Sequence, residues 1–151
     1  MISKNPRMIN VMKSILVLGC DEACHSQMIS ALLKHITFDR INVQTAVLKE
    51  AHTNPFAKKV LQELGININK ENPRPVNEFI HSKFDIIITT NEKAKEKVEN
   101  LLMGATKIHK SFINPLELYD DELDLDASFR ELRDSMQEWL NEFVVRHRLS
   151  A

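Results

Sequence analysis

Two runs of consecutive apolar residues constrain the fold of this chain most strongly. They are KSILVLG, residues 13–19, and FDIIITT, residues 84–90. A short continuous apolar run is typical of a strand that is buried on both faces, as in a parallel sheet covered by helices. We therefore expect both runs to lie inside such a sheet.

The segments around these two runs predict the remaining elements. Apolar spacing and composition predict helices at residues 26–36, 55–65, 92–101 and 128–146, and further strands at residues 41–47 and 105–109. Short strands that alternate with helices are typical of a parallel sheet with helices on both faces. The expected fold is therefore α/β, with a doubly wound sheet of four parallel strands as the middle of three layers.

Several residues indicate where the elements begin and end. Asn54 followed by Pro55 is a good helix start, and Gly65 is a good helix end. Residues 72–75, NPRP, predict a loop that leads into a short helical turn at residues 76–81. The acidic stretch at residues 120–126 predicts a solvated loop.

The last predicted helix carries an apolar stripe that we expect to be buried. Its members are Phe129, Leu132, Met136, Trp139, Leu140 and Phe143. A chain of 151 residues is long enough for one domain with a sizeable core. We expect residues 13–151 to form that single domain and residues 1–12 to be a loose N-terminal extension.

Composition excludes several partners and compartments. The formal net charge is −1, so no global field favours nucleic acid or an anionic membrane. No apolar run is long enough to span a bilayer, and the first dozen residues lack the apolar stretch of a signal peptide. We therefore expect a cytoplasmic protein, in which the two cysteines, Cys20 and Cys24, are reduced thiols.

Five segments, in order along the chain, carry a family resemblance. KSILVLG leads into CHSQM, where the family has Cys-Arg-Ser-Gln-Met; the others are TNPFAKKVLQELGINI, FDIIITTNEKAKE, MGATKIHKSFINP and SFRELRDSMQEWL. With these segments the chain resembles the low-molecular-weight protein tyrosine phosphatases, and more closely their arsenate reductase branch. The resemblance implies the phosphotyrosine protein phosphatase I-like fold, with the active loop at the carboxyl end of the first strand.

The resemblance also implies which residues should carry the chemistry. In this family a cysteine at the start of the loop is the nucleophile, an arginine near its end clamps the oxyanion, and an aspartate on a later loop protonates the leaving group. A gapless alignment on Ser26 places Gly19, His25 and Asn114 at these three positions. The relay cysteines of the reductase branch fall on Asn91 and Val98. All the required side chains are then replaced.

The loop itself also carries unexpected charge. The predicted ligand-binding loop consists of Gly19, Cys20, Asp21, Glu22, Ala23, Cys24, His25 and Ser26. Asp21 and Glu22 stand where the family prefers small or neutral residues, and each would repel a bound phosphate by about 1 kcal/mol or more. A one-residue deletion would instead place Cys20 at the nucleophile position, although nearby acids would raise the pKa of its thiol.

Each unusual residue of the loop has a structural interpretation beside the functional one. Cys24 fits a small, half-buried thiol, or it forms a redox pair with Cys20. His25 is a weak substitute for the arginine or a solvent-facing residue of the first helical turn. A zinc site is a third hypothesis, which combines the loop cysteines and His25 with His52 and His109, although the spacing matches no known zinc pattern.

The expected function follows from the lost side chains. We predict a non-catalytic binding or regulatory homologue, with an unidentified protein or small molecule bound at the altered loop and with no cofactor. Two alternatives remain open at this stage. One is an active thiol-dependent phosphatase or reductase that uses Cys20, Cys24 or both, and the other is a metal-binding regulator at the same loop.

Overall fold

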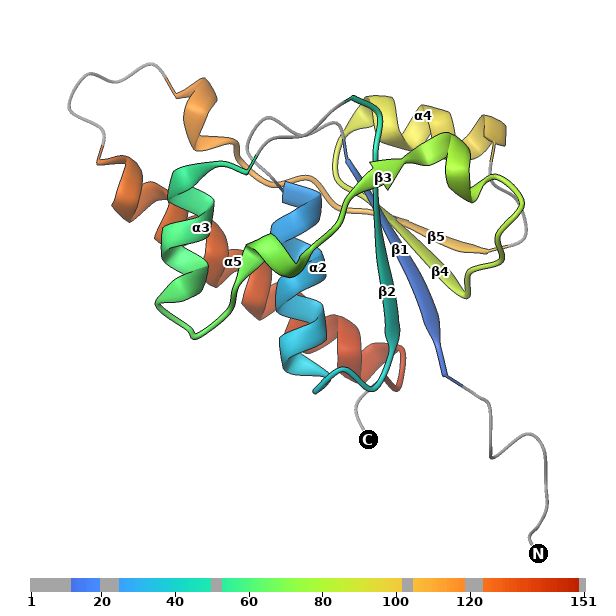
Figure 1. Ribbon diagram of the computed structural model, residues 1–151, viewed down its shortest axis with the longest axis horizontal. Coiled ribbons are helices and arrows are strands. Elements are labelled where there is room, and N and C mark those ends of the chain that lie inside the picture. The colour runs from blue at the N-terminus through green and yellow to red at the C-terminus, as the bar shows by residue number, and fades with distance from the viewer. Residues whose placement is uncertain (1–11, 20–24, 50–52, 102–104, 119–123, 150–151) are drawn as a thin grey trace, which may run out of the picture.

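A five-stranded parallel sheet forms the centre of the protein. The computed structural model describes residues 12–19, 25–49, 53–101, 105–118 and 124–149. The strand order is β3-β2-β1-β4-β5 (Figure 1). The strands are β1 (Ser14–Gly19), β2 (Asn42–Val47), β3 (Arg74–Pro75), β4 (Ile86–Thr89) and β5 (Thr106–His109). The predicted parallel α/β architecture is confirmed.

The sheet has one strand more than the sequence predicts. β3 is only two residues long, and Arg74 and Pro75 pair with Ala46 and Val47 of β2. The pattern NPRP predicts a loop because proline lacks a backbone N–H donor. At the edge of a sheet this donor is not needed, so the proline is tolerated there. The expected short helical turn follows directly, as the 3-10 turn η2 (Val76–Phe79).

Helices cover both faces of the sheet. They are α2 (His25–Ile36), α3 (Pro55–Gln62), α4 (Glu92–Leu101) and α5 (Leu125–Arg146), with further 3-10 turns η1 (Ile68–Lys70) and η3 (Pro115–Glu117). In Figure 1, α2, α3 and α5 lie together on one side of the sheet and α4 lies on the other. The chain therefore has the expected three layers.

The boundaries of α3 and α5 depend on capping residues. Asn54 caps α3 as predicted, since its Oδ1 accepts hydrogen bonds from the N–H groups of Phe56 and Ala57. Gly65 ends the following turn with a φ of +77°, which glycine adopts without strain. The long helix α5 begins earlier than predicted, because Asp124 accepts a hydrogen bond from the N–H of Ala127. The predicted loop therefore does not extend to residue 126, and residues 120–123 lie outside the described residues.

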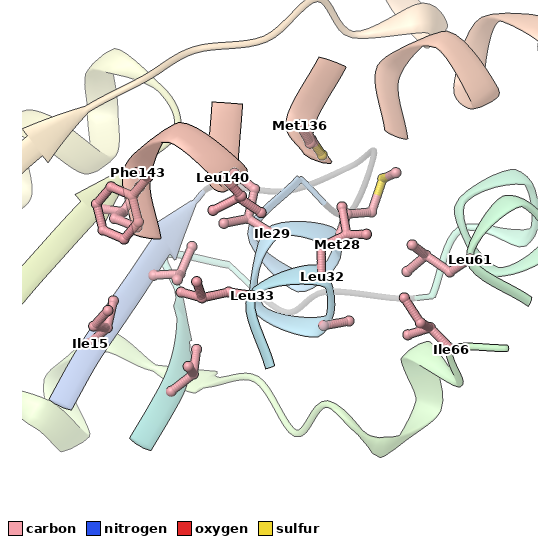
Figure 2. Packing of buried hydrophobic residues seen from close by; sticks show 14 of the residues in the cluster. Ile15, Met28, Ile29, Leu32, Leu33, Leu61, Ile66, Met136, Leu140 and Phe143 are labelled. Carbon is pink, nitrogen blue, oxygen red and sulfur yellow. The ribbon is translucent and has the colours of Figure 1, made fainter. Parts of the chain in front are cut away.

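The core has two parts, one on each face of the sheet. Successive residues of β1 alternate between them, with Ile15 and Val17 facing α2 and α5, and Leu16 and Leu18 packing in the smaller cluster with Val98 of α4. Figure 2 shows the larger cluster, in which Met28, Ile29, Leu32 and Leu33 of α2 lie among side chains of the sheet, of α3 and of α5. The predicted stripe of α5 is confirmed there, with Trp139 only partly buried.

Ion pairs join the end of α3 to a partly exposed and a buried arginine of α5, Arg130 and Arg133. Glu63, the residue that follows α3, accepts hydrogen bonds from Arg130 Nε at 3.0 Å and Arg130 Nη2 at 2.7 Å. Arg133 Nη1 donates to the same carboxylate at 2.8 Å and to the carbonyl of Val60 at 2.8 Å. The hydrogen bonds from Arg130, aided by those from Arg133, lower the pKa of Glu63 to about 2.

This low pKa predicts a pH-dependent effect of Glu63→Gln on stability. The stabilising effect of Glu63 is complete above the pKa of an unfolded glutamate, about 4.3, and is lost as the pH falls toward the folded value. The melting temperature of the variant should therefore lie below that of the wild type at neutral pH, and the two should converge between about pH 4 and pH 2.

Thermal unfolding followed by circular dichroism across this pH range measures the difference. Glu99→Gln, an exposed glutamate of α4, is the matched control and should follow the wild type at every pH. A Glu63→Gln difference that stays constant down to pH 2 would contradict the role of the charge.

Candidate functional site

The carboxyl end of β1 and the start of α2 define the candidate site. Hydrogen bonds hold the last residues of β1 from both sides, because the Leu18 carbonyl accepts from the Thr90 N–H at 3.1 Å and the Gly19 carbonyl accepts from the Leu48 N–H at 3.2 Å. β1 ends at Gly19 and α2 begins at His25. The loop thus leaves a central strand and enters a helix N-terminus, the arrangement at which anions bind in many α/β proteins.

The structure describes three residues of the predicted loop, Gly19, His25 and Ser26. Cys20, Asp21, Glu22, Ala23 and Cys24 lie outside the described residues. The structure therefore describes the two fixed ends of the loop, at Gly19 and at His25.

The first turn of α2 is polar but buried. His25 is 6% exposed, Ser26 0% and Gln27 2%. One turn further on, the Thr45 hydroxyl of β2 donates to Ser30 Oγ at 2.7 Å, which fixes the helix against the sheet. The interpretation of His25 as a solvent-facing residue is therefore wrong, because the helix start is packed against the fold.

His25 cannot reproduce the chemistry of the family arginine, with which the gapless alignment matches it. A guanidinium presents five N–H donors in a rigid fork that can hold two oxygens of one anion. An imidazole has only two ring nitrogens, which point in different directions. Even a protonated His25 would therefore donate at most one hydrogen bond to a given anion, and it would not form a bidentate clamp.

Asn114, which the gapless alignment places at the position of the general acid, serves a structural purpose. It lies in the segment that follows β5, and its side-chain Oδ1 accepts a hydrogen bond from the Leu116 N–H at 2.9 Å as the cap of η3. Because the carboxyl ends of parallel strands share one edge, this segment leaves the sheet on the same side as the loop after β1. A carboxamide has no acidic proton to give to a leaving group.

Asn91 and Val98, which the gapless alignment places at the positions of the relay cysteines, also have structural roles. Asn91 Oδ1 accepts a hydrogen bond from the Ala94 N–H at 2.8 Å at the start of α4. Val98 is 1% exposed and belongs to the core between α4 and the sheet. Neither side chain can take part in disulfide exchange.

Polar contacts at the end of β4 are a feature that the sequence interpretation missed. Thr89 Oγ1 lies 2.8 Å from Nδ1 of His109, and His109 Nε2 lies 3.4 Å from Glu92 Oε1. Thr90, which is buried, also reaches the Leu18 carbonyl through its hydroxyl. In the sequence, these contacts could have been indicated by the Thr-Thr pair that directly follows three isoleucines, where a parallel strand ends.

These contacts bear on the zinc hypothesis. Both ring nitrogens of His109 already face a protein partner. Within the part of the chain that the structure describes, no three histidine, cysteine or acidic side chains lie close enough to hold a metal ion. Cys20, Cys24 and His52, which the hypothesis also needs, lie outside that part. Among the described helices, none is long and apolar enough to cross a membrane.

The fold described above agrees with the family that comparison with known proteins identifies. Residues 14–149 match the family of low molecular weight phosphotyrosine protein phosphatases, and the chain belongs to that family. The chain is 30% identical over 135 residues to arsenate reductase 1 of Staphylococcus epidermidis, which covers 89% of this chain and 97% of that protein. It is 27% identical over 132 residues to the arsenate reductase of Bacillus subtilis, and this alignment covers 87% of this chain and 95% of that protein.

Solved structures agree with this fold. An arsenate reductase in its reduced state superposes with a TM-score of 0.67 at 21% identity, over 89% of this chain and 98% of the other. The tyrosine phosphatase amsI of Erwinia amylovora superposes with a TM-score of 0.68 at 20% identity, over 90% and 93%. At these identities the likeness concerns the fold alone.

The capping role of Asn114 gives a prediction. Asn114→Asp should keep the free energy of unfolding of the wild type, because a carboxylate accepts the same hydrogen bond from the Leu116 N–H. Asn114→Ala should lower stability by about 0.5–1 kcal/mol, because this N–H loses its partner. Chemical denaturation of both variants measures the difference, and an equal loss in both would contradict the cap.

Proposed function

We propose that this protein is a non-catalytic binding or regulatory member of its family. The observation that carries the proposal is the identity of the residues at the three aligned positions, Gly19, His25 and Asn114. The spacing between the end of β1 and the start of α2 supports the gapless alignment, since Gly19 is the last residue of the strand and His25 the first of the helix.

Each replacement removes a separate part of the chemistry. Gly19 has no side chain and forms no covalent phosphoenzyme. His25 provides no bidentate clamp for the equatorial oxygens of phosphate. Asn114 does not protonate a leaving group, and a positioned general acid typically contributes about 10²–10⁴-fold to a rate. Losing the nucleophile alone removes the covalent route, so the three replacements together leave no path for turnover.

The charge of the loop supports a changed ligand. Asp21 and Glu22 are adjacent in the sequence of the loop, and the family arginine that would offset them is replaced. A loop with two carboxylates and no guanidinium disfavours a doubly charged oxyanion. We therefore propose that the loop binds an unidentified protein or small molecule that is not a phosphate ester.

One observation favours an active enzyme as the second candidate. Cys20 follows directly after the last residue of β1, only one position from the aligned nucleophile. The arsenate reductases to which the chain is similar make thiol chemistry the natural alternative. In that case Cys20 acts without the arginine and beside two acids, which raise the pKa of a thiol and reduce the thiolate fraction at neutral pH.

Hydrolysis of p-nitrophenyl phosphate separates the two candidates. The assay uses the full chain under reducing conditions from pH 5 to pH 8, with Cys20→Ser and Cys24→Ser measured alongside. We expect no release of p-nitrophenol above buffer in any of the three proteins, because no nucleophile lies at the aligned position.

The contradicting result is equally specific. Turnover that disappears in Cys20→Ser but persists in Cys24→Ser would show that Cys20 is the nucleophile and that the gapless alignment is wrong by one residue. An active member of the family serves as the positive control for substrate and buffer.

A further inference from the structure

A cavity of about 490 Å³ lies between α5 and the segment that follows β5. The segment contributes Lys110, Phe112, Ile113 and Pro115, and one side of α5 contributes residues from Ser128 to Glu142. Small-molecule sites in proteins commonly have volumes of about 300–1,000 Å³, so the cavity has the size of a ligand site. Among the described residues, neither Gly19 nor His25 belongs to its lining, whereas Ile113 and Pro115, the two neighbours of Asn114, do.

The inner surface of the cavity is aromatic. Phe112 and Trp139 meet edge to face with ring centres 6.2 Å apart, and Trp139 stacks on Phe143 at 5.2 Å. Trp139 is only partly buried, although it packs against the main core. Leu132, at 5% exposure, completes the apolar wall on α5. A half-open site with an aromatic wall provides hydrophobic contact for the apolar part of a ligand.

The rim of the cavity is acidic. Glu131, Glu138 and Glu142 line it from α5, and all three are exposed. None of them forms an ion pair with another residue in the described part of the chain, in contrast to the arginines of the same helix that pair with Glu63. Lys110, whose Nζ lies 5.2 Å from the centre of the Phe112 ring, is the one basic residue among the described residues of the lining.

We propose that this cavity binds a small organic cation, an amine or guanidinium carried on an apolar ring or chain. The three glutamates exceed the single lysine in charge, so the site is complementary to a positive group and repels an anion. The aromatic wall accepts the apolar body, and the acidic rim receives the charge. This ligand class is opposite in charge to the phosphate esters of the family, and the proposal does not depend on the function of the loop after β1.

The single tryptophan makes the proposal measurable. Trp139 is the only tryptophan of the chain, so fluorescence excited selectively at tryptophan reports on this cavity. Phenethylamine, phenethyl alcohol and 3-phenylpropionate share a phenyl ring and differ in charge, and each is titrated into the full chain at pH 7. We expect a saturable change with the amine, an affinity for the alcohol lower by about tenfold, and no saturation with the anion.

Variants identify the source of the preference. The triple variant Glu131→Gln, Glu138→Gln, Glu142→Gln should bind the amine about five- to tenfold more weakly and leave the affinity for the alcohol unchanged. Because these side chains are exposed, the variant should retain the circular dichroism spectrum of the wild type. Glu99→Gln, on α4 and away from the cavity, should bind the amine like the wild type.

Three outcomes would overturn the proposal. The first is equal affinity for amine and alcohol, which would make the site merely apolar. The second is the absence of saturation by the amine at concentrations up to about 50 mM, because even weak specific binding of a ligand of this size would saturate below that concentration. The third is a fluorescence change when the ligand-free protein is diluted, which would show that a second copy of the chain occupies the cavity.

Discussion

The pairing of β1 with a parallel strand on each side is the constraint on which the rest of the structure depends. All six residues of β1 pair with β2, and four of them pair with β4. Ile15 to Leu18 are 0% exposed, so this strand forms the boundary between both parts of the core. The strand ends at Gly19, and the loop to α2 therefore begins at a fixed point of the carboxyl edge. The positions of the later segments, after β4 and β5, follow from the same parallel register.

Much of this arrangement could be predicted from the sequence because it depends on local patterns. The apolar runs at residues 13–19 and 84–90 indicate buried strands directly, and Asn54 before Pro55 indicates a capped helix. The strand at Arg74–Pro75 could not be predicted, because it exists only through its neighbour β2. The early start of α5 depends on one capping contact of Asp124, which is one of several acidic residues in its segment. Such features are decided by tertiary context rather than by residue type.

The candidate site also combines features that the sequence predicts with features that depend on tertiary structure. The sequence places Gly19, His25 and Asn114 at the positions of the family nucleophile, arginine and acid, and the chain belongs to that family. The burial of His25 and the cap made by Asn114 depend on packing and on backbone geometry. Asn91 and Val98, at the relay positions, likewise serve a helix start and a core. At four of these positions, His25, Asn91, Val98 and Asn114, the side chain is packed or capping and so contributes to the fold.

Binding of inorganic phosphate tests the central claim most directly, because it measures the loop without any requirement for turnover. Isothermal titration calorimetry at pH 7 compares the wild type with a variant that combines Asp21→Gly, Glu22→Asn and His25→Arg, which restores the charge pattern of the family. We predict no saturable heat from the wild type up to about 10 mM phosphate, and measurable binding by the variant, because its arginine faces an anion without competing carboxylates. Saturable binding of phosphate by the wild type, equal to that of the variant, would contradict the account.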